Sequence, residues 1–311
     1  MKSIPGLSAC IITLNEQENL PECLQSLTLA QEIVVVDSGS TDDTRKIARD
    51  AGARIFRREF DNYIDQKNFA IEKARGPWIL FLDADERIGP ELDVEIRALF
   101  QKPHSLKSDR GGSSKGKKQF RASLATLEDQ PVGYEIPRST FYLGRWIRHS
   151  GWYPDYTVRL FRKGSGRYEG RTFHEKVKLR GLSGKLRGAI LHFSYKNIRE
   201  HLDVINRYSD LFAAERISMG KGNGVLFSLG KAVVKFLTMY IWKLGLLDGR
   251  AGLVIAVLGS YYNFLKYIKV WELRAASNRS PEARMDAPRV PEKSTRGGSA
   301  RSEAAAPGKH P

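Results

Sequence analysis

Cysteine is scarce in this sequence: Cys10 and Cys23 are the only two among 311 residues. Cys10 lies in an apolar run and Cys23 in a helical pattern, and their spacing matches no metal-binding motif. Two such thiols cannot form the disulfide framework of a small secreted domain. We therefore expect both to be small core residues in a reducing compartment.

Other signals are also missing. The N-terminus has no signal-peptide pattern, because the apolar stretch that follows Met1–Gly6 soon reaches Asn15 and Glu16. We therefore expect the N-terminal half to stay in the cytoplasm. The sequence shows neither heptads nor an internal repeat, which argues against a coiled coil and a repeat array.

Acidic residues are few relative to basic ones: 35 Asp and Glu against 51 Lys and Arg, a net charge of +16. Such an imbalance implies an anionic partner, which can be nucleic acid, an anionic lipid surface or a phosphorylated substrate. Nucleic-acid binding would require basic residues interleaved with stacking aromatics, or a recognisable module. The sequence has neither, so no nucleic-acid partner is expected.

Strand and helix patterns alternate through the N-terminal third of the chain. Apolar runs predict strands at 7–14, 32–37, 53–56 and 78–83, and helical patterns follow them at 15–25, 43–51, 64–73 and 90–100. This alternation predicts an α/β fold with a mostly parallel sheet flanked by helices. In such sheets, ligands bind beyond the carboxyl ends of the strands.

Four polar side chains follow the ends of these strands: Asn15, Asp37, Asp83 and Asp85. Asp83 and Asp85, with one residue between them, can meet one divalent ion, which would neutralise the charge on a diphosphate leaving group. Asp37 can accept hydrogen bonds from a nucleobase or a ribose hydroxyl. Taken singly, each could instead be a turn residue or a helix cap.

Two long apolar stretches, 225–247 and 253–270, are expected to be helical. The first carries Lys231, Lys235 and Lys243, which make spanning a bilayer costly. Because Lys231 and Lys235 share one sector of the helix, we favour amphipathic helices that lie in the membrane interface. A spanning or re-entrant hairpin and an ordinary core helix are the alternatives.

Three motifs in a fixed order resemble the family 2 glycosyltransferases of the GT-A fold: residues 11–16 (IITLNE), 35–42 (VVDSGSTD) and 81–86 (FLDADE). Further segments look like a narrower group, the lipopolysaccharide-core β-1,4-glucosyltransferases: 65–68, 151–155, 159–162, 173–177, 264–267 and 271–272. The resemblance covers roughly residues 7–273, apart from a central insert.

The resemblance implies contacts with a sugar nucleotide for a set of residues: Thr13, Asn15, Glu16, Asp37, Ser38, Lys67 and Asp83. Asp37 would bind the uracil of a UDP-sugar, and Lys67 would lie near the nucleotide or its diphosphate. Asp85, together with Asp83, would ligate Mg or Mn as the cofactor.

The family inverts at the anomeric carbon, and a single displacement needs one base for the acceptor hydroxyl. We favour Glu175 as this base, with Asp83 and Asp85 completing the catalytic set. His174 is the alternative, because adjacent side chains on a strand point to opposite faces.

Four arginines can bind the diphosphate or an anionic acceptor: Arg145, Arg148, Arg159 and Arg162. Trp146 and Trp152 can stack on sugar rings or pack in the core. The Gln-x-x-Arg-Trp signature of processive polymerases is absent, because Tyr142 stands where that signature has Gln. A single addition is therefore expected.

We predict an inverting transferase that moves a hexose, with glucose favoured, from a UDP-sugar to a membrane glycolipid such as lipopolysaccharide core. It would work at the cytoplasmic face of the inner membrane, as a peripheral or monotopic protein. Two alternatives remain: the same chemistry on a polyprenyl-phosphate or capsule intermediate, and a non-catalytic protein that binds nucleotide sugars or nucleic acid.

The predicted organisation has five parts. Residues 1–100 form the nucleotide-sugar-binding half of the GT-A domain, 101–133 a flexible basic insert, and 134–218 the acceptor-side half. Residues 219–274 form membrane-associated helices, and 275–311, rich in Arg, Ser, Ala and Pro, form a disordered tail.

Overall fold

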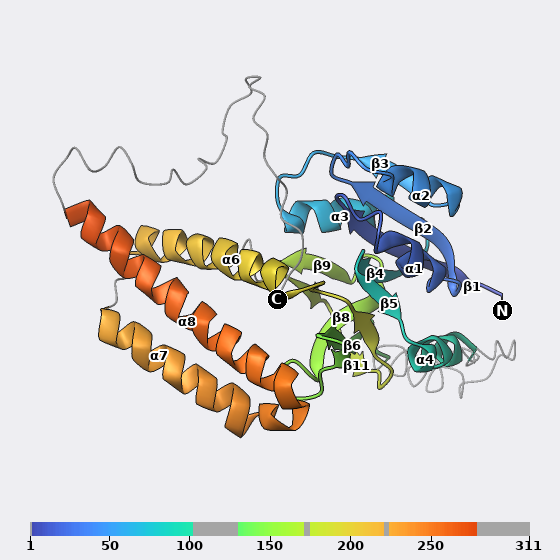
Figure 1. The fold of residues 1–311 in the computed structure, drawn as a ribbon. Helices are drawn as coiled ribbons and strands as arrows, with labels where there is room; N and C mark the ends of the chain where they lie inside the picture. The colour runs from blue at the N-terminus through green and yellow to red at the C-terminus, as the bar shows by residue number, and fades with distance from the viewer. Residues whose placement is uncertain (1, 102–129, 171–174, 221–223, 279–311) are drawn as a thin grey trace, which may run out of the picture. The chain divides into compact units, whose positions relative to one another are not determined.

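The computed structural model describes residues 2–101, 130–170, 175–220 and 224–278 (Figure 1). The chain forms two compact units: the first unit is Met1–Ser139 with Pro154–His192, and the second unit is Thr140–Tyr153 with Phe193–Pro311. Residues 140–153 belong to the second unit, where Phe141 packs on Phe193 and Tyr142 on Tyr195. Most of the predicted insert, 102–129, lies outside the described residues.

The first unit begins with alternating strands and helices. Its elements are β1 (Ile4–Thr13), α1 (Leu20–Gln25), β2 (Ala30–Asp37), α2 (Thr44–Asp50), β3 (Arg54–Arg57), α3 (Tyr63–Lys73), β4 (Trp78–Asp83), β5 (Glu86–Ile88) and α4 (Pro90–Gln101). Strands follow: β6 (Gly133–Tyr142, which runs on into the second unit), β8 (Asp155–Arg162), β9 (Gly166–Glu169), β10 (Lys176–Leu179), β11 (Ser183–Lys185) and β12 (Ile190–His192).

The main sheet has the strand order β3-β2-β1-β4-β8-β6-β12-β5. The first four strands are parallel, but β8 is antiparallel to both β4 and β6, and β12 is antiparallel to β5. The sheet is therefore mixed, which corrects the prediction of a mostly parallel sheet. Among the described residues between 130 and 192 no helix connects the strands, and without such crossovers neighbouring strands pair mainly antiparallel.

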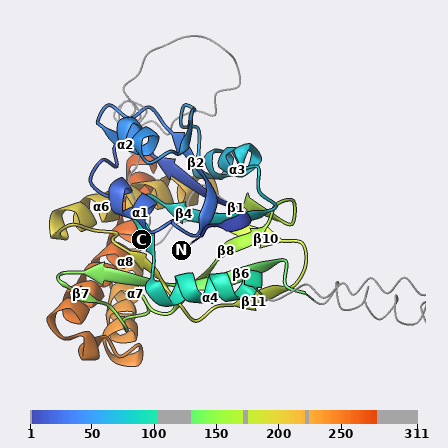
Figure 2. The same ribbon diagram turned by 90° about the vertical axis from the view of Figure 1, so that its right-hand side faces the viewer.

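Both faces of the sheet are buried. Along β4, Leu80 and Leu82 belong to one hydrophobic cluster, whereas Ile79 and Phe81 belong to another, as alternation along a strand requires. Figure 2 shows α3 and α4 on opposite sides of these strands. Cys10 and Cys23 are buried free thiols, which confirms their predicted place in the core.

The second unit is mainly helical. It holds β7 (Arg145–Trp146), α6 (Ile198–Ser218), α7 (Val225–Leu237), the π-helical turn η1 (Thr238–Trp242), the 3-10 turn η2 (Gly245–Asp248) and α8 (Gly249–Asn278). In Figure 1, α8 lies between α6 and α7 and packs against both. Helix α8 continues past the predicted start of the tail at 275, and 279–311 lie outside the described residues.

Two stretches of this unit, Val225–Trp242 and Gly245–Ala276, have the length and composition of membrane-crossing helices. Core helices of soluble proteins pass the same test, but those are mostly buried. Here only 11% and 28% of the most apolar windows are buried within the structure. The residues of these windows are therefore mostly exposed, as in α7, or partly buried, as in α8.

An aromatic cluster fills the start of the second unit. The rings of Tyr195 and His201 stack at 4.2 Å, and Tyr142 and Trp152 pack around them. The hydroxyl of Tyr142 lies 2.9 Å from Nδ1 of His201, and burial lowers the pKa of His201 from 6.5 to about 4. Trp152 thus packs in this cluster, and Trp146 packs similarly against Phe141 and Phe193.

We expect acid to destabilise the protein through His201. Its pKa is lower in the folded chain, so the unfolded chain binds more protons between pH 6.5 and about 4, and stability falls as pH falls through that window. At pH 5 the loss relative to neutral pH should be about 2 kcal/mol. Denaturant unfolding followed by tryptophan fluorescence measures it.

The variant His201→Gln should lose this component of the pH dependence, whatever its stability at neutral pH. His149→Gln, in the same unit, should keep it. An unchanged slope in His201→Gln would show that another group causes the acid sensitivity.

Candidate active site

The carboxyl ends of β1, β2 and β4 meet at one edge of the first unit. In the parallel register, Thr13 lies opposite Asp37 and Ile12 lies opposite Asp83. The predicted residues Thr13, Asp37 and Asp83 are therefore neighbours at this edge, as the strand-end argument requires.

The loops that follow β1 and β2 are joined by side chain–backbone hydrogen bonds. Asn15 has a left-handed backbone (φ 53), which Asn tolerates well, and its Oδ1 accepts from the N–H of Thr41 at 2.9 Å. The N–H of Asn15 donates to Ser40 Oγ at 2.9 Å, and the N–H of Glu16 to Thr44 Oγ1 at 2.8 Å. Asn15 and Glu16 thus shape the rim of the edge.

Asp37 is fully buried and closes the turn after β2. Its Oδ2 accepts from the N–H groups of Gly39 and Ser40 at 3.0 and 3.1 Å, and Ser40 Oγ donates to its Oδ1. Ser38 Oγ accepts from Gln66 Nε2 at 3.0 Å. The Asp37 carboxylate therefore shapes this turn, and uracil binding by Asp37 stays a prediction.

A buried ionic network holds the turn between β4 and β5. Glu86, with no exposed surface, accepts from the N–H of Asp83 at 3.0 Å and from Arg159 Nη2 at 2.6 Å. Arg159 Nη2 also donates to Asp83 Oδ2 at 2.9 Å. Burial alone would lower the pKa of Arg159, but Glu86 and Asp83 outweigh it and raise that pKa well above its ordinary value. Arg159 therefore positions Asp83.

Lys67 joins two of the predicted catalytic carboxylates. Helix α3 starts at the N-cap Asn62 and carries Lys67 into the interior, where Lys67 Nζ lies 3.0 Å from Glu175 Oε1 and 3.5 Å from Asp83 Oδ1. Its Nζ also lies 5.1 Å from the centre of the Tyr168 ring. Burial would lower the pKa of Lys67, but Asp83, Tyr168 and Glu175 raise it, so Lys67 stays charged.

Asp85 faces a residue that the sequence analysis missed. Because β5 pairs antiparallel with β12, Glu86 lies opposite His192, and Asp85 Oδ2 comes within 3.6 Å of His192 Nε2. Both side chains are nearly buried. His192 ends a short apolar strand and belongs to none of the sequence motifs. Its contact with Asp85 arises only from the pairing of two strands that are distant in sequence.

This donor pair fits a divalent ion. Carboxylate and imidazole are both metal ligands, and Mg or Mn usually completes its coordination with substrate phosphate and water. The described residues contain no group of three or more His, Cys, Asp or Glu side chains that could hold a metal by themselves. Asp85 and His192 could hold the ion, whereas Asp83 already contacts Arg159 and Lys67.

The other predicted arginines lie elsewhere. Arg145 donates to the carbonyl of Asp248 at 2.7 Å, and the N–H of Arg148 to Asp248 Oδ1 at 3.2 Å, both within the second unit. The guanidinium of Arg162 lies 5.4 Å from the centre of the Trp78 ring. His174, the alternative base, lies outside the described residues.

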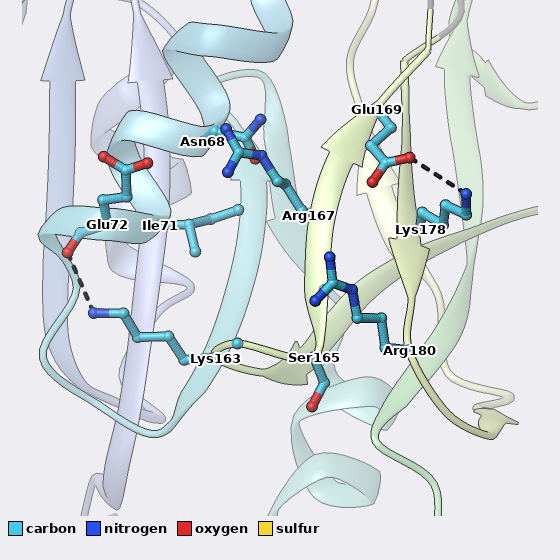
Figure 3. A pocket seen from close by; sticks show the side chains of 11 residues that line it. Asn68, Ile71, Glu72, Lys163, Ser165, Arg167, Glu169, Lys178 and Arg180 are labelled. Atoms are coloured by element: carbon cyan, nitrogen blue, oxygen red, sulfur yellow. Dashed lines mark hydrogen bonds and ion pairs between the residues drawn. The ribbon is translucent and has the colours of Figure 1, made fainter.

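A separate basic pocket of about 460 Å³ lies between α3 and the β9–β10 pair (Figure 3). Lys163 Nζ donates to the carbonyls of Glu72 and Ala74 at 3.2 and 2.5 Å, and Lys178 pairs with Glu169 at 3.5 Å. None of the predicted site residues lines this pocket. The carboxyl edge, not this pocket, is the candidate active site.

Comparison with known sequences defines the class of protein. The profile of Glycosyl transferase family 2 matches residues 8–165, and so covers the three motifs. The chain therefore belongs to this family, as the motifs predicted, and the mixed sheet flanked by helices is GT-A-like.

Individual relatives point the same way. The lipopolysaccharide core biosynthesis glycosyltransferase LpsC of Rhizobium meliloti (strain 1021) is 31% identical over 284 residues, which cover 88% of this chain and 94% of LpsC. An uncharacterized glycosyltransferase of Rickettsia typhi is 25% identical over 281 residues, 87% of this chain and 88% of its own. The predicted likeness to lipopolysaccharide-core enzymes is thus confirmed.

Solved structures match less extensively. Glucosyl-3-phosphoglycerate synthase from Mycobacterium tuberculosis, in complex with Mn²⁺, uridine-diphosphate and phosphoglyceric acid, matches 26% of this chain and 33% of its own, with 28% identity and a TM-score of 0.25. S. aureus TarS matches 66% of this chain and 40% of its own, with 16% identity and a TM-score of 0.38. Neither likeness carries an argument about ligands.

We expect Asp85→Asn and His192→Gln each to weaken Mn²⁺ binding by about tenfold or more if this pair holds the ion, because each would remove one of the two candidate ligands. Electron paramagnetic resonance titration of free Mn²⁺, with and without UDP, measures the affinity directly. Asp43→Asn, which removes an exposed carboxylate of the first unit, is the matched control. Parental Mn²⁺ affinity in both variants would place the metal elsewhere.

Proposed function

We propose that this protein is an inverting glycosyltransferase that moves one hexose, with glucose as the first candidate, from a UDP-sugar to a membrane glycolipid of the lipopolysaccharide-core type. It would act at the cytoplasmic face of the inner membrane with Mg or Mn as cofactor. The observation that carries the proposal is the single ammonium group, Lys67 Nζ, that joins Glu175 to Asp83 beside the Asp85–His192 pair.

The surroundings of Glu175 support a role for its carboxylate as the general base. Its carboxylate is nearly buried, with 4% of the side chain exposed, and Lys67 Nζ at 3.0 Å holds it close to Asp83, which lies 3.5 Å from the same ammonium group. In the transfer, the acceptor oxygen bonds to the anomeric carbon while the bond from that carbon to the diphosphate oxygen breaks. The hydroxyl proton passes to the Glu175 carboxylate.

The remaining residues would orient the donor. Asp83, held by Arg159, would receive hydrogen bonds from donor hydroxyls, and Lys67 would stabilise the charge that develops on the departing diphosphate. The metal, when bound by Asp85 and His192, would supply further neutralisation of that charge. Thr13, Asn15, Glu16, Asp37 and Ser38 would form the nucleotide side of the site.

The acceptor class is supported by the LpsC relative, whose name places it in lipopolysaccharide core biosynthesis and which aligns with 88% of this chain. The exposed apolar surface of α7 and α8 supports work at a membrane, since an acceptor embedded in lipid must be reached from the bilayer surface.

Glu175→Gln should lower the rate of transfer by about 10²–10⁴-fold while leaving the affinity for UDP within a few-fold of the parent, because it removes the base but keeps an amide oxygen that can accept from Lys67. Glu169→Gln is the matched control: it lies on β9, pairs only loosely with Lys178 and is half exposed, so it should keep full activity. Calorimetry with UDP and a transfer assay separate the two effects. Full transfer activity in Glu175→Gln would exclude it as the base.

The function itself is tested by incubating the purified protein with UDP-, GDP- and dTDP-sugars, in Mn²⁺ and in EDTA. Metal-dependent release of UDP from one sugar is the expected result and names the donor. Lack of both turnover and binding for every donor, in detergent and with membranes present, would overturn the proposal.

A further inference from the structure

Three helices of the second unit bring several cations around one group of aromatic rings. The ring of Tyr267 on α8 packs against Phe212 of α6 and Phe227 of α7, with centroids 5.4 and 5.3 Å apart. Lys266 Nζ lies 5.1 Å from the centre of the Tyr267 ring, and Lys231 Nζ lies 5.3 Å from that of Phe227. The two ammonium groups therefore sit over adjacent rings.

Lys235 belongs to the same group of charges. It lies one helical turn from Lys231 on α7, on the side of that helix that faces α8: its Cε would come within 4.0 Å of a Cβ placed on Gly259. We call Lys231, Lys235 and Lys266 the lysine cluster. Hydrogen bonds from Asn263 to the carbonyl of Lys231 (2.9 Å), and from Ser260 to that of Ala232 (2.8 Å), hold α7 to α8 beneath it.

The lysine cluster lacks acidic partners among the described residues. Helix α7 contains no Asp or Glu, and Asp210 of α6 pairs with Lys269 at 2.7 Å. Burial, together with the nearby charges of Lys235, Arg216 and Lys231, lowers the pKa of Lys266 to about 8. Burial and the charge of Lys243 likewise lower the pKa of Lys235. Like charges held together this way favour an anion from outside the chain.

An exposed apolar surface adjoins the lysine cluster. Leu226, Val233 and Leu237 recur along one face of α7 with 84%, 58% and 45% of their surface exposed, and Trp242 of η1 is 86% exposed. On a helical projection, Lys231 borders the exposed apolar arc next to Phe227 and Val234, whereas Lys235 lies further round the helix, toward α8. A helix with an apolar face and a lysine at its border is suited to the headgroup level of a bilayer, where lysines reach phosphates.

We propose that the lysine cluster binds the phosphate of anionic membrane lipids, so that α7 and α8 dock on the bilayer at a defined place. The inference deepens the membrane part of the proposed function and rests on it for its biological setting. The occupant is a lipid headgroup, because the apolar face beside the cluster offers its acyl chains a place that a soluble phosphate ester would not use.

The test is binding of the full chain to vesicles of phosphatidylcholine alone and of phosphatidylcholine mixed with phosphatidylglycerol, measured by co-sedimentation. The triple variant Lys231→Gln, Lys235→Gln, Lys266→Gln should lose about 100-fold in affinity for the anionic vesicles, since each well-placed lysine contributes a factor of about five. Its binding to the neutral vesicles should stay unchanged, because the apolar face is intact.

A matched control removes the same charge from the first unit: Lys2→Gln, Lys46→Gln, Lys185→Gln, all exposed. This control should lose only a few-fold in affinity. Equal losses of affinity in the two triple variants would overturn the proposal in favour of diffuse charge attraction. Parental affinity of the cluster variant for anionic vesicles would also overturn it, because the three lysines would then contribute nothing to binding.

A second measurement uses the unaltered chain and does not depend on whether a variant folds. Anionic vesicles should protect Lys231, Lys235 and Lys266 from acetylation more than they protect Lys46 and Lys185, and equal protection would contradict the site. Both measurements need no catalysis. If no sugar nucleotide turns over, the proposed function fails while the lipid site is still judged on its own result.

Discussion

The candidate site depends on the burial of Glu86. A buried carboxylate is costly unless it is paired and hydrogen-bonded. Glu86 accepts hydrogen bonds from Arg159 and from the N–H of Asp83, and it forms a longer ion pair with Arg138. The same Arg159 group reaches on to Asp83, so one ionic network sets the position of the first carboxylate of the Asp-x-Asp motif. Removing Glu86 would leave two guanidinium groups without their buried partner, and the turn from β4 to β5 would lose the bond that closes it.

Because of that network, Asp83 and Asp85 have different roles although they are close in sequence. Asp83 lies between Arg159 and Lys67, so its charge is already balanced and it suits hydrogen bonding to a sugar. Asp85 lies in the turn that follows β4 and meets the imidazole of His192. Because the strand ends at Asp83, the turn gives the two side chains different neighbours and therefore different chemistry.

The sequence analysis reached the parts of the site that follow from local pattern. Thr13, Asp37 and Asp83 end strands that are parallel neighbours, so the general rule about strand ends was enough to bring them together. His192 and the role of Glu86 could not be found this way, because both depend on distant segments: His192 on the pairing of β5 with β12, and Glu86 on Arg159 of β8. The mixed sheet was missed for the same reason: short strands after residue 133 give no periodic signal of which neighbour they choose.

The basic residues of the two units differ in whether they have acidic partners. In the first unit the buried cations have carboxylate partners: Arg159 and Arg138 share Glu86, and Lys67 is bracketed by Glu175 and Asp83. In the second unit α7 carries lysines and no acid, next to apolar side chains that are left exposed. If the excess positive charge served only to keep the protein soluble, it would be spread over the polar surface, away from apolar faces. On α7 the lysines instead lie on the same helix as exposed apolar side chains, with Lys231 next to Phe227 and Val234, and this supports the proposal that the helix meets a surface that is both anionic and apolar, such as a lipid bilayer.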